Sequence, residues 1–268
     1  MSESEVLRVE KEGHIAWLIL NRPKKRNAMN LEMLQGFIET FDRLDADPEV
    51  RVVVIKGEGL SFCAGMELAA LAGLLESSSA DYRERLRREI VRFQHGMTIV
   101  EQCRKPVIAA IHGACVGGGV DLTCACDIRV ASRDAFFSVR ETRLALVADL
   151  GTLQRLPYIV GDPWARELAL TGRDFSAEEA LKIGFITHLL ENQAALYQKA
   201  EELAREIADC SPLAVTGVKD TLRFTRENGV KAGLEYVAQK NAAILICEDG
   251  LEAITAHQQK RKPKFKGC

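Results

Sequence analysis

The amino-acid sequence predicts an α/β fold in which short buried strands alternate with amphipathic helices, and three observations support this prediction. Apolar runs at residues 14–23 and 50–59 are rich in β-branched side chains and end at proline or glycine, as buried strands do. Residues 30–47 carry apolar side chains at helical spacing instead. With 268 residues, 47% of them apolar, the chain also has enough apolar material for one large core.

The first half of the chain alternates between the two kinds of element. Pro23 ends the first strand, because proline has no backbone N–H to donate. Asn30 is the predicted N-cap of the first helix, with Glu32 on its polar face. The predicted elements are, in order, a strand at 14–23, a helix at 30–47, a strand at 50–59, a loop opening into a helix at 61–75, a charged solvent-facing segment at 77–90, a helix at 91–103, and strands at 105–114, 127–132 and 135–139.

The second half changes character and ends in a tail that is predicted to be almost entirely helical. Ser176 and Glu179 form a capping-box pattern, and Pro212 follows Ser211 at the first position of a later helix. The longer helices are predicted at residues 194–212, 212–228, 230–248 and 251–262. We therefore divide the chain into a core at 1–193 and a helical C-terminal region at 194–268, which would pack on the core or mediate oligomerisation.

The composition argues against several classes of protein. A net charge of −2 and a pI near 6.3 do not suit a nucleic-acid-binding protein, which usually carries a basic surplus. No apolar run is long enough to span a bilayer, and residues 1–13 lack the apolar core of a signal peptide, so a cytoplasmic location is expected. The eight cysteines include no C-x-x-C pair, so we expect buried free thiols, with only Cys268 exposed, and no metal site.

A cluster of glycines at residues 113–119 is the most informative motif. No lysine follows it as in a Walker loop, and its order does not match the G-x-G-x-x-G of dinucleotide-binding folds. Glycines at a strand-to-helix turn can serve close packing alone. They can also leave the unpaired N–H groups of a first helical turn open to an oxyanion. Residues 61–68, placed between another strand and helix, could supply a second amide.

The motifs at residues 61–68 and 105–132 resemble the enoyl-CoA hydratase/isomerase family, also called the crotonase family, and the resemblance covers nearly the whole chain. It implies a crotonase-like spiral of ββα units with a helical C-terminal region, assembled as a homotrimer or homohexamer. It also implies that the amides of Met66 and Gly118 form an oxyanion hole for the thioester carbonyl of an acyl-CoA. Coenzyme A is then part of the substrate, and no other cofactor, no nucleic acid and no membrane partner are expected.

The resemblance further implies which residues line the CoA site. The basic segment 24–26 would form salt bridges to the CoA phosphates, with a solvated turn as the alternative. Residues near the C-terminus would help to close a CoA site, in some relatives that of a neighbouring subunit. The implied CoA-binding residues are Lys25, Arg26, Ala28, Ala64, Met66, Leu68, Phe265 and Lys266.

Three acidic residues distinguish between the reactions of the family. In the hydratases two glutamates flank one water molecule, and Asp121 and Glu141 fall at those positions. Asp121 is one methylene shorter than glutamate, which weakens the hydratase interpretation. The third acid, Asp149, lies in an apolar stretch, where an unpaired carboxylate is costly or has a raised pKa. Its structural alternatives are an N-cap before residues 151–157 or an ion pair with Arg155 or Arg143.

Residues 136–157 resemble the dienoyl-CoA isomerases of this family, which convert 3,5-dienoyl-CoA to 2,4-dienoyl-CoA in fatty-acid β-oxidation. Their three acids match Asp121, Glu141 and Asp149. One proton must leave C2 and another must reach C6, so two separated carboxyl groups suit the reaction. The resemblance implies that Glu141 takes the C2 proton, Asp149 delivers the C6 proton and Asp121 tunes the electrostatics. An enoyl-CoA hydratase is the first alternative, and a non-catalytic acyl-CoA- or RNA-binding member the second.

The chain departs from the pattern of the dienoyl-CoA isomerases after Glu141. Arg143 stands where the isomerases have an acid, and Ala145 replaces a glycine. A positive charge at this place would be expected to lower the pKa of a nearby carboxyl group.

Overall fold

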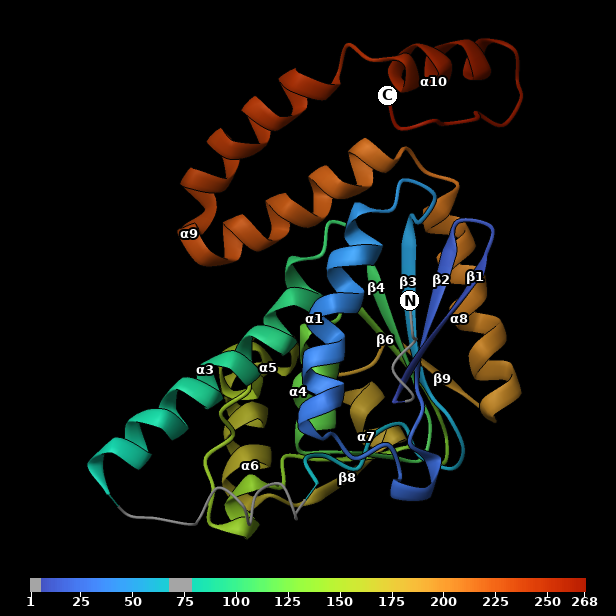
Figure 1. The fold of residues 1–268 in the computed structure, drawn as a ribbon. Coiled ribbons are helices and arrows are strands. Elements are labelled where there is room, and N and C mark those ends of the chain that lie inside the picture. The colour runs from blue at the N-terminus through green and yellow to red at the C-terminus, as the bar shows by residue number, and fades with distance from the viewer. Residues whose placement is uncertain (1–5, 68–78) are drawn as a thin grey trace.

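The computed structural model describes residues 6–67 and 79–268 and confirms the α/β class (Figure 1). The larger sheet has the strand order β1-β2-β3-β4-β6-β9, and the smaller has the order β5-β7-β8. The strands of the larger sheet are β1 (Leu7–Glu12), β2 (Ile15–Leu20), β3 (Val52–Gly57), β4 (Val107–Ile111), β6 (Ile128–Ser132) and β9 (His188–Leu190). Those of the smaller sheet are β5 (Ala114–Val116), β7 (Phe136–Ser138) and β8 (Asp174–Ser176).

Two helices of the described residues begin at the caps that the sequence predicts. Asn30 accepts a hydrogen bond from the Met33 amide at 3.0 Å, and Ser176 accepts one from the Glu179 amide at 3.2 Å, so both predicted caps are confirmed. The α-helices are α1 (Leu31–Ala46), α3 (Ala80–Gln102), α4 (Gly118–Ala125), α5 (Thr152–Val160), α6 (Asp162–Thr171), α7 (Ala177–Lys182), α8 (Gln193–Ala208), α9 (Pro212–Ile244) and α10 (Glu248–Gln258). Two short 3₁₀ turns are η1 (Pro23–Lys25) and η2 (Glu141–Leu144).

The central strands β2, β3 and β4 of the larger sheet are buried on both faces. Strands β2, β3, β4, β6 and β9 run parallel, so alternate side chains of each strand enter different cores. Val53 and Ile55 pack in the core that α1 covers, whereas Val52 and Val54 pack against α8. The carboxyl ends of the parallel strands meet at one edge, where α/β proteins place their ligands.

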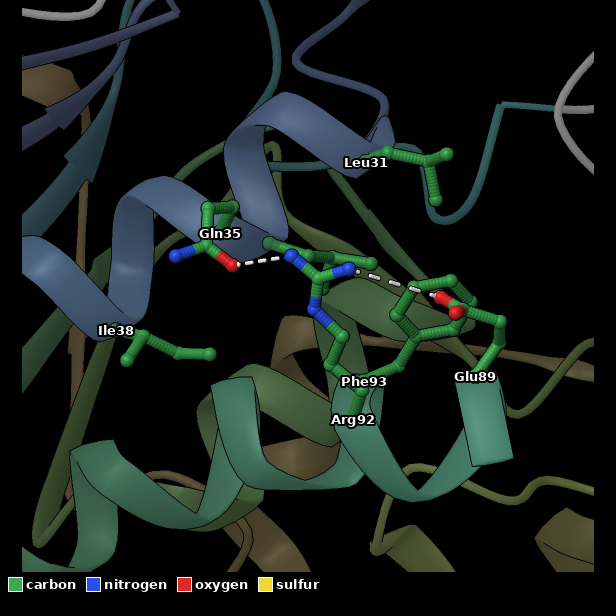
Figure 2. A pocket seen from close by; sticks show the side chains of 7 residues that line it. Leu31, Gln35, Ile38, Glu89, Arg92 and Phe93 are labelled. Carbon is green, nitrogen blue, oxygen red and sulfur yellow. Dashed lines mark hydrogen bonds and ion pairs between the residues drawn. The ribbon is translucent and has the colours of Figure 1, made fainter. Parts of the chain in front are cut away.

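Helix α3 is one continuous helix rather than the charged segment and separate helix that the sequence predicts. Ser79 caps it by accepting from the Tyr82 amide at 3.2 Å, and its charged first turns are solvent-exposed. It lies close to α1, because a Cβ on Gly96 would lie 3.1 Å from the Leu34 carbonyl oxygen. Figure 2 shows Arg92 of α3 pointing at Gln35 of α1, which it contacts at 2.7 Å. The hollow beside this pair measures about 40 Å³, far too small for an acyl-CoA.

The helical C-terminal region has two structurally different parts. Helix α8 packs on the larger sheet with Leu196, Ala200 and Ala204, so it completes the core. Helices α9 and α10 extend beyond the amino ends of the strands (Figure 1). Gly229, at φ 83°, breaks α9 into two arms. The boundary at residue 193 and the oligomerisation role stay predictions. None of the helices in the described ranges has the length and apolarity needed to cross a bilayer.

Candidate active site

The loop at residues 61–67 is held on both sides by short parallel bridges. Cys63 pairs with Cys115 on one side, and Met66 pairs with Met29 on the other. In a parallel bridge one of the two paired residues forms both hydrogen bonds, and its partners are the residues before and after the other paired residue. Here the Met29 amide donates to the Gly65 oxygen at 2.7 Å, and the Glu67 amide donates to the Met29 oxygen at 2.8 Å. The Met66 N–H therefore points away from Met29.

The Met66 amide faces the start of α4. A Cβ on Gly118 would lie 3.7 Å from the Met66 nitrogen, and a Cβ on Gly65 would lie 3.6 Å from the Gly118 nitrogen. Gly118 is the first residue of α4, so its N–H has no intrahelical acceptor. Within residues 6–67 and 79–268, neither amide has a hydrogen-bond acceptor. Two unpaired N–H groups thus converge, as a carbonyl oxygen that gains negative charge requires.

The glycines on either side of Gly118 serve two different purposes. Gly117 has φ 52°, donates to the Ser138 oxygen at 2.9 Å, and has Glu141 Oε1 only 3.0 Å from where a Cβ would stand. A side chain at position 117 would therefore push Glu141 away. Gly119 fits the packing interpretation, since a Cβ there would lie 2.7 Å from the Cys63 oxygen.

Glu141 begins η2, three residues after β7 ends beside Gly117. Its Oε2 atom is buried and has no hydrogen-bond partner among the described residues. Burial raises the pKa of Glu141 to about 7, with further contributions from the charges of Asp121 and Asp149. A buried carboxylate oxygen without a partner is unusual and is suited to receive a proton from a ligand.

Asp121 lies in the first turn of α4 and is almost completely buried. Its Oδ1 accepts hydrogen bonds from the amide and the hydroxyl of Thr152, each at 2.7 Å. Burial raises the pKa of Asp121 to about 6, although the bonds from Thr152 oppose this shift. Asp121 thus caps the start of α5 from a neighbouring helix. The sequence alone makes Asp149 a candidate for this capping role.

Asp149 is an exposed residue between the buried Ala148 and Leu150 in the loop that joins η2 to α5. The structural alternatives proposed for it are wrong. Gly151 is the N-cap of α5, without a side-chain cap. Arg155 pairs with Glu101, and Arg143 donates to the Thr171 oxygen at 3.2 Å. Partial burial of the carboxyl group raises the pKa of Asp149.

The expected effect of Arg143 on the acids is also contradicted. Burial raises the pKa values of Glu141 and Asp149 rather than lowering them. Arg143 turns toward α6, where it donates to the Thr171 oxygen. Ala145 adopts φ 58°, the left-handed conformation that glycine occupies at lower cost.

Five of the predicted CoA-binding residues lie together, three in the segment 25–28 and two in the loop 61–67. The Ala64 amide donates to the Arg26 oxygen at 3.0 Å, which joins the segment after η1 to this loop. Lys25 is exposed, and its Nζ atom lies 3.4 Å from Oε1 of Glu67. It is therefore a charged group at the rim of the site, which is formed by residues 22–28 and the loop 61–67. Leu68 lies outside the described residues. The five residues that the fold brings together are Lys25, Arg26, Ala28, Ala64 and Met66.

Two residues that support this rim were not predicted from the sequence. Asn27 is fully buried at φ 55° and donates to the oxygens of Ser61 and Glu58 at 2.7 and 2.9 Å. Arg22 donates to the Ala28 oxygen and to Glu67. The sequence could have indicated the turn at Asn27, because asparagine is favoured in the left-handed conformation.

Phe265 and Lys266 lie elsewhere in the same chain. The Phe265 oxygen accepts from Arg51 at 2.8 Å, and Arg51 directly precedes β3. The Lys266 amide donates to Asp249 of α10 at 2.7 Å. Arg51 lies at the amino end of β3, whereas the loop 61–67 follows its carboxyl end, so the tail lies at the opposite edge of the sheet from this loop. Figure 1 shows α10 beyond the amino ends of the strands. One chain therefore does not bring the tail to its own site.

The cysteines are distributed largely as predicted. Five are buried, but Cys210 is exposed as well as Cys268, so the expectation of a single exposed thiol is wrong. No group of three or more potential metal ligands occurs in the part of the chain that the structure describes.

Comparisons with known proteins identify the family of the chain. The profile of the enoyl-CoA hydratase/isomerase family matches residues 10–268. The chain is 48% identical over 266 residues to the peroxisomal Delta(3,5)-Delta(2,4)-dienoyl-CoA isomerase of Arabidopsis thaliana, covering 97% of this chain and 96% of the relative. It is 40% identical over 266 residues to the mitochondrial protein of the same name from Homo sapiens, covering 97% and 81%.

The fold comparison leads to the same family. The crystal structure of an enoyl-CoA hydratase from Bacillus anthracis matches with a TM-score of 0.91 at 33% identity, over 98% of this chain and 100% of that one. The predicted crotonase-like architecture is thereby confirmed. With a matching profile over almost its whole length, the chain belongs to the enoyl-CoA hydratase/isomerase family.

Proposed function

We propose that this protein isomerises 3,5-dienoyl-CoA to 2,4-dienoyl-CoA. The observation that carries the proposal is a pair of carboxyl groups that form no ion pair with the other described residues. They are Glu141 beside the two free amides, with its Oε2 atom buried and unpartnered, and Asp149 in the loop before α5. The similarity to proteins named dienoyl-CoA isomerase, at 40–48% identity over nearly the whole chain, supports it.

The proposed mechanism begins at the thioester. The N–H groups of Met66 and Gly118 donate to the thioester oxygen, and Glu141 removes a proton from C2. The electron pair of the broken C–H bond spreads over the dienolate from the oxygen to C6. Asp149 then gives a proton to C6, which forms a new C–H bond and leaves the 2,4-diene. No electron is gained or lost overall, and the cycle closes when the proton on Glu141 is exchanged for one on Asp149.

The pKa values suit these roles. A pKa of about 7 lets Glu141 act as a base near neutral pH. The pKa of Asp149 is already raised, and an acyl chain lying against it would bury it further and favour the protonated, donating form.

The hydratase alternative needs Asp121 and Glu141 to share a water molecule. The Oδ1 atom of Asp121 already accepts two hydrogen bonds from Thr152, so this acid is less available for water than a hydratase requires. A non-catalytic or RNA-binding role would leave Glu141 buried without a partner for no gain, and the net charge of −2 does not favour RNA.

One pair of assays tests the proposal. The protein is incubated with a 3,5-dienoyl-CoA while the absorbance of the conjugated 2,4-dienoyl thioester is followed, and separately with a 2-enoyl-CoA while loss of the enoyl absorbance is followed. We expect rapid conversion in the first assay and slow or no hydration in the second. Hydration without dienoyl conversion would replace this function by that of a hydratase.

The dependence of kcat/KM on pH below neutrality, the acid limb of the pH profile, provides a further prediction. We expect kcat/KM to fall as the pH drops below about 7, because Glu141 must be ionised to act as a base. Asp121→Asn removes a negative charge that raises the pKa of Glu141, so it should move this limb to lower pH. Measuring kcat/KM from about pH 5 to about pH 9 for both proteins tests this, and an unmoved limb would exclude the proposed influence of Asp121.

The proposal also concerns the oligomeric state of the protein and its location in the cell. Since Phe265 and Lys266 lie at the far edge of their own sheet, we infer that they contribute to a CoA site only in a homotrimer or homohexamer. CoA would enter as part of the substrate, with no other cofactor. The cytoplasmic location stays a prediction, and relatives are named peroxisomal or mitochondrial.

A further inference from the structure

The loop that carries Asp149 rests on one face of α3. Gln94 donates through Nε2 to the Asp149 backbone oxygen at 2.7 Å. Thr98 and Glu101 lie four and seven residues further along, so the three side chains form one stripe on the helix. All three are half-buried, whereas Phe93, Met97 and Val100 of α3 face the core. The stripe is therefore available to hold the loop rather than to fill the interior.

Thr98 and Glu101 contact the loop through Arg155. The guanidinium of Arg155 donates to Glu101 Oε2 at 2.8 and 3.0 Å and to the Thr98 hydroxyl at 3.3 Å. Its Nη1 points at the Leu150 oxygen, 3.5 Å away, and lies 1.7 Å from where a Cβ on Gly151 would stand. The guanidinium thus packs directly on the backbone of the two residues that follow Asp149, and only glycine at position 151 leaves room for it.

Glu101 is held by a second cation from another helix. Arg226 of α9 contacts Glu101 Oε1 at 2.6 Å, so the two oxygens of one carboxylate bind two guanidiniums. The side chains of Arg155 and Glu101 are only 9% and 16% exposed, and a pair buried to this degree is screened little by solvent. The contacts form a continuous chain from α9 through α3 to the loop.

We propose that Gln94, Thr98 and Glu101 of α3 are positioning residues that hold the carboxylate of Asp149 at the remote carbon of the substrate. The inference rests on the proposed function, because it assigns a task to the loop only if Asp149 is the acid that protonates C6. Ala148 and Leu150 of the loop are buried in the core, so the contacts from α3 fix the backbone of the exposed residue between them. A displacement of about 1 Å at a reacting group can cost up to about 100-fold in rate.

The test separates the two proton transfers. In D₂O, exchange of the C2 hydrogen of the substrate reports on Glu141, whereas appearance of the 2,4-diene also requires Asp149. Gln94→Ala removes the hydrogen bond to the loop with little effect on the core. We expect it to lower the rate of diene formation about tenfold while the rate of C2 exchange stays within about twofold of the parent protein.

Two further variants make the result specific. Gln35→Ala is the matched control, because Gln35 makes a similar hydrogen bond to α3, at 2.7 Å, but from α1 and away from the loop. It should change neither rate. In an Asp149→Asn background, Gln94→Ala should cause no further loss of diene formation, since a positioning residue acts only through the group it positions.

The rates of C2 exchange and diene formation together distinguish the positioning role from the proposed function. If Gln94→Ala lowers C2 exchange and diene formation equally, or lowers neither, the positioning role is wrong while the proposed function stands. If the Asp149→Asn variant forms the diene at the parental rate, the C6 role of Asp149 is wrong, and the positioning role is overturned with it. Glu101→Gln provides a second test. It should lower diene formation more than Gln94→Ala does and also lower the melting temperature, because two guanidiniums lose their anionic partner.

Discussion

Glu141→Gln is expected to lower kcat/KM for a 3,5-dienoyl-CoA by about 10³-fold, because general-base catalysis typically contributes 10²–10⁴-fold. Glutamine preserves the size of the side chain beside Gly117 but cannot accept the C2 proton. Exchange of the C2 hydrogen with solvent should be lost to the same degree, since both measurements depend on the same step. Substrate binding should change little, because the Met66 and Gly118 amides are untouched.

The same substitution should stabilise the protein at alkaline pH. The pKa of Glu141 is about 7 in the folded chain against an ordinary value of 4.5, so the folded state binds its proton more tightly than the unfolded state. Stability is therefore lost as the pH rises from about 4.5 to about 7. At about pH 8 the parent chain must bury an unpaired carboxylate, and Glu141→Gln should raise the free energy of unfolding by about 2 kcal/mol.

Denaturant unfolding at about pH 5 and about pH 8 measures this difference, which should be much smaller at the lower pH. Glu49→Gln, at an exposed glutamate before β3, is the control for loss of one carboxylate and should leave both rate and stability unchanged. A Glu141→Gln variant that is less stable than the parent at about pH 8 would show that the carboxylate is a structural group.

Asp149→Asn is expected to lower the rate of diene formation by about 10³-fold while C2 exchange continues at nearly the parental rate. The asparagine cannot give a proton to C6, so the dienolate formed by Glu141 returns to the starting isomer. The uncoupling of exchange from product formation is what distinguishes this variant from Glu141→Gln. Asp149 is exposed and has no ion pair among the described residues, so the melting temperature should hardly change.

Loss of C2 exchange in Asp149→Asn would contradict the assignment of the C2 proton to Glu141 and the C6 proton to Asp149. It would indicate that the two proton transfers depend on the same group. Asp174→Asn provides a comparison, since Asp174 is an exposed carboxylate whose partner is Arg140 rather than a ligand. It is expected to retain both rates.

The fold and the unpaired amide at the start of α4 could be predicted because local signals specify them, whereas Met66 was assigned from the resemblance to the family. Strands and caps follow from residue type and spacing, as Asn30 and Ser176 show. The free amide of Gly118 follows from a helix start after glycine, which is visible in the sequence. These features depend on neighbours in the chain.

What could not be predicted depends on contacts across the fold. The partner of Arg155 is Glu101, 54 residues away, and no local pattern favours it over Asp149. Asp121 caps a helix that begins 31 residues later. The position of Phe265 at the amino end of β3 likewise follows from the path of α9 and α10 rather than from the tail sequence.

The double bridging of the loop 61–67 has a consequence for the entropy of the reaction. Ordering a mobile backbone costs about 1–2 kcal/mol per residue, and in many enzymes that ordering accompanies substrate binding. Here Cys63 and Met66 are fixed by neighbouring segments before any substrate arrives. The entropy of the donor loop is therefore lost during folding, and the activation entropy of enolate formation should reflect the substrate alone.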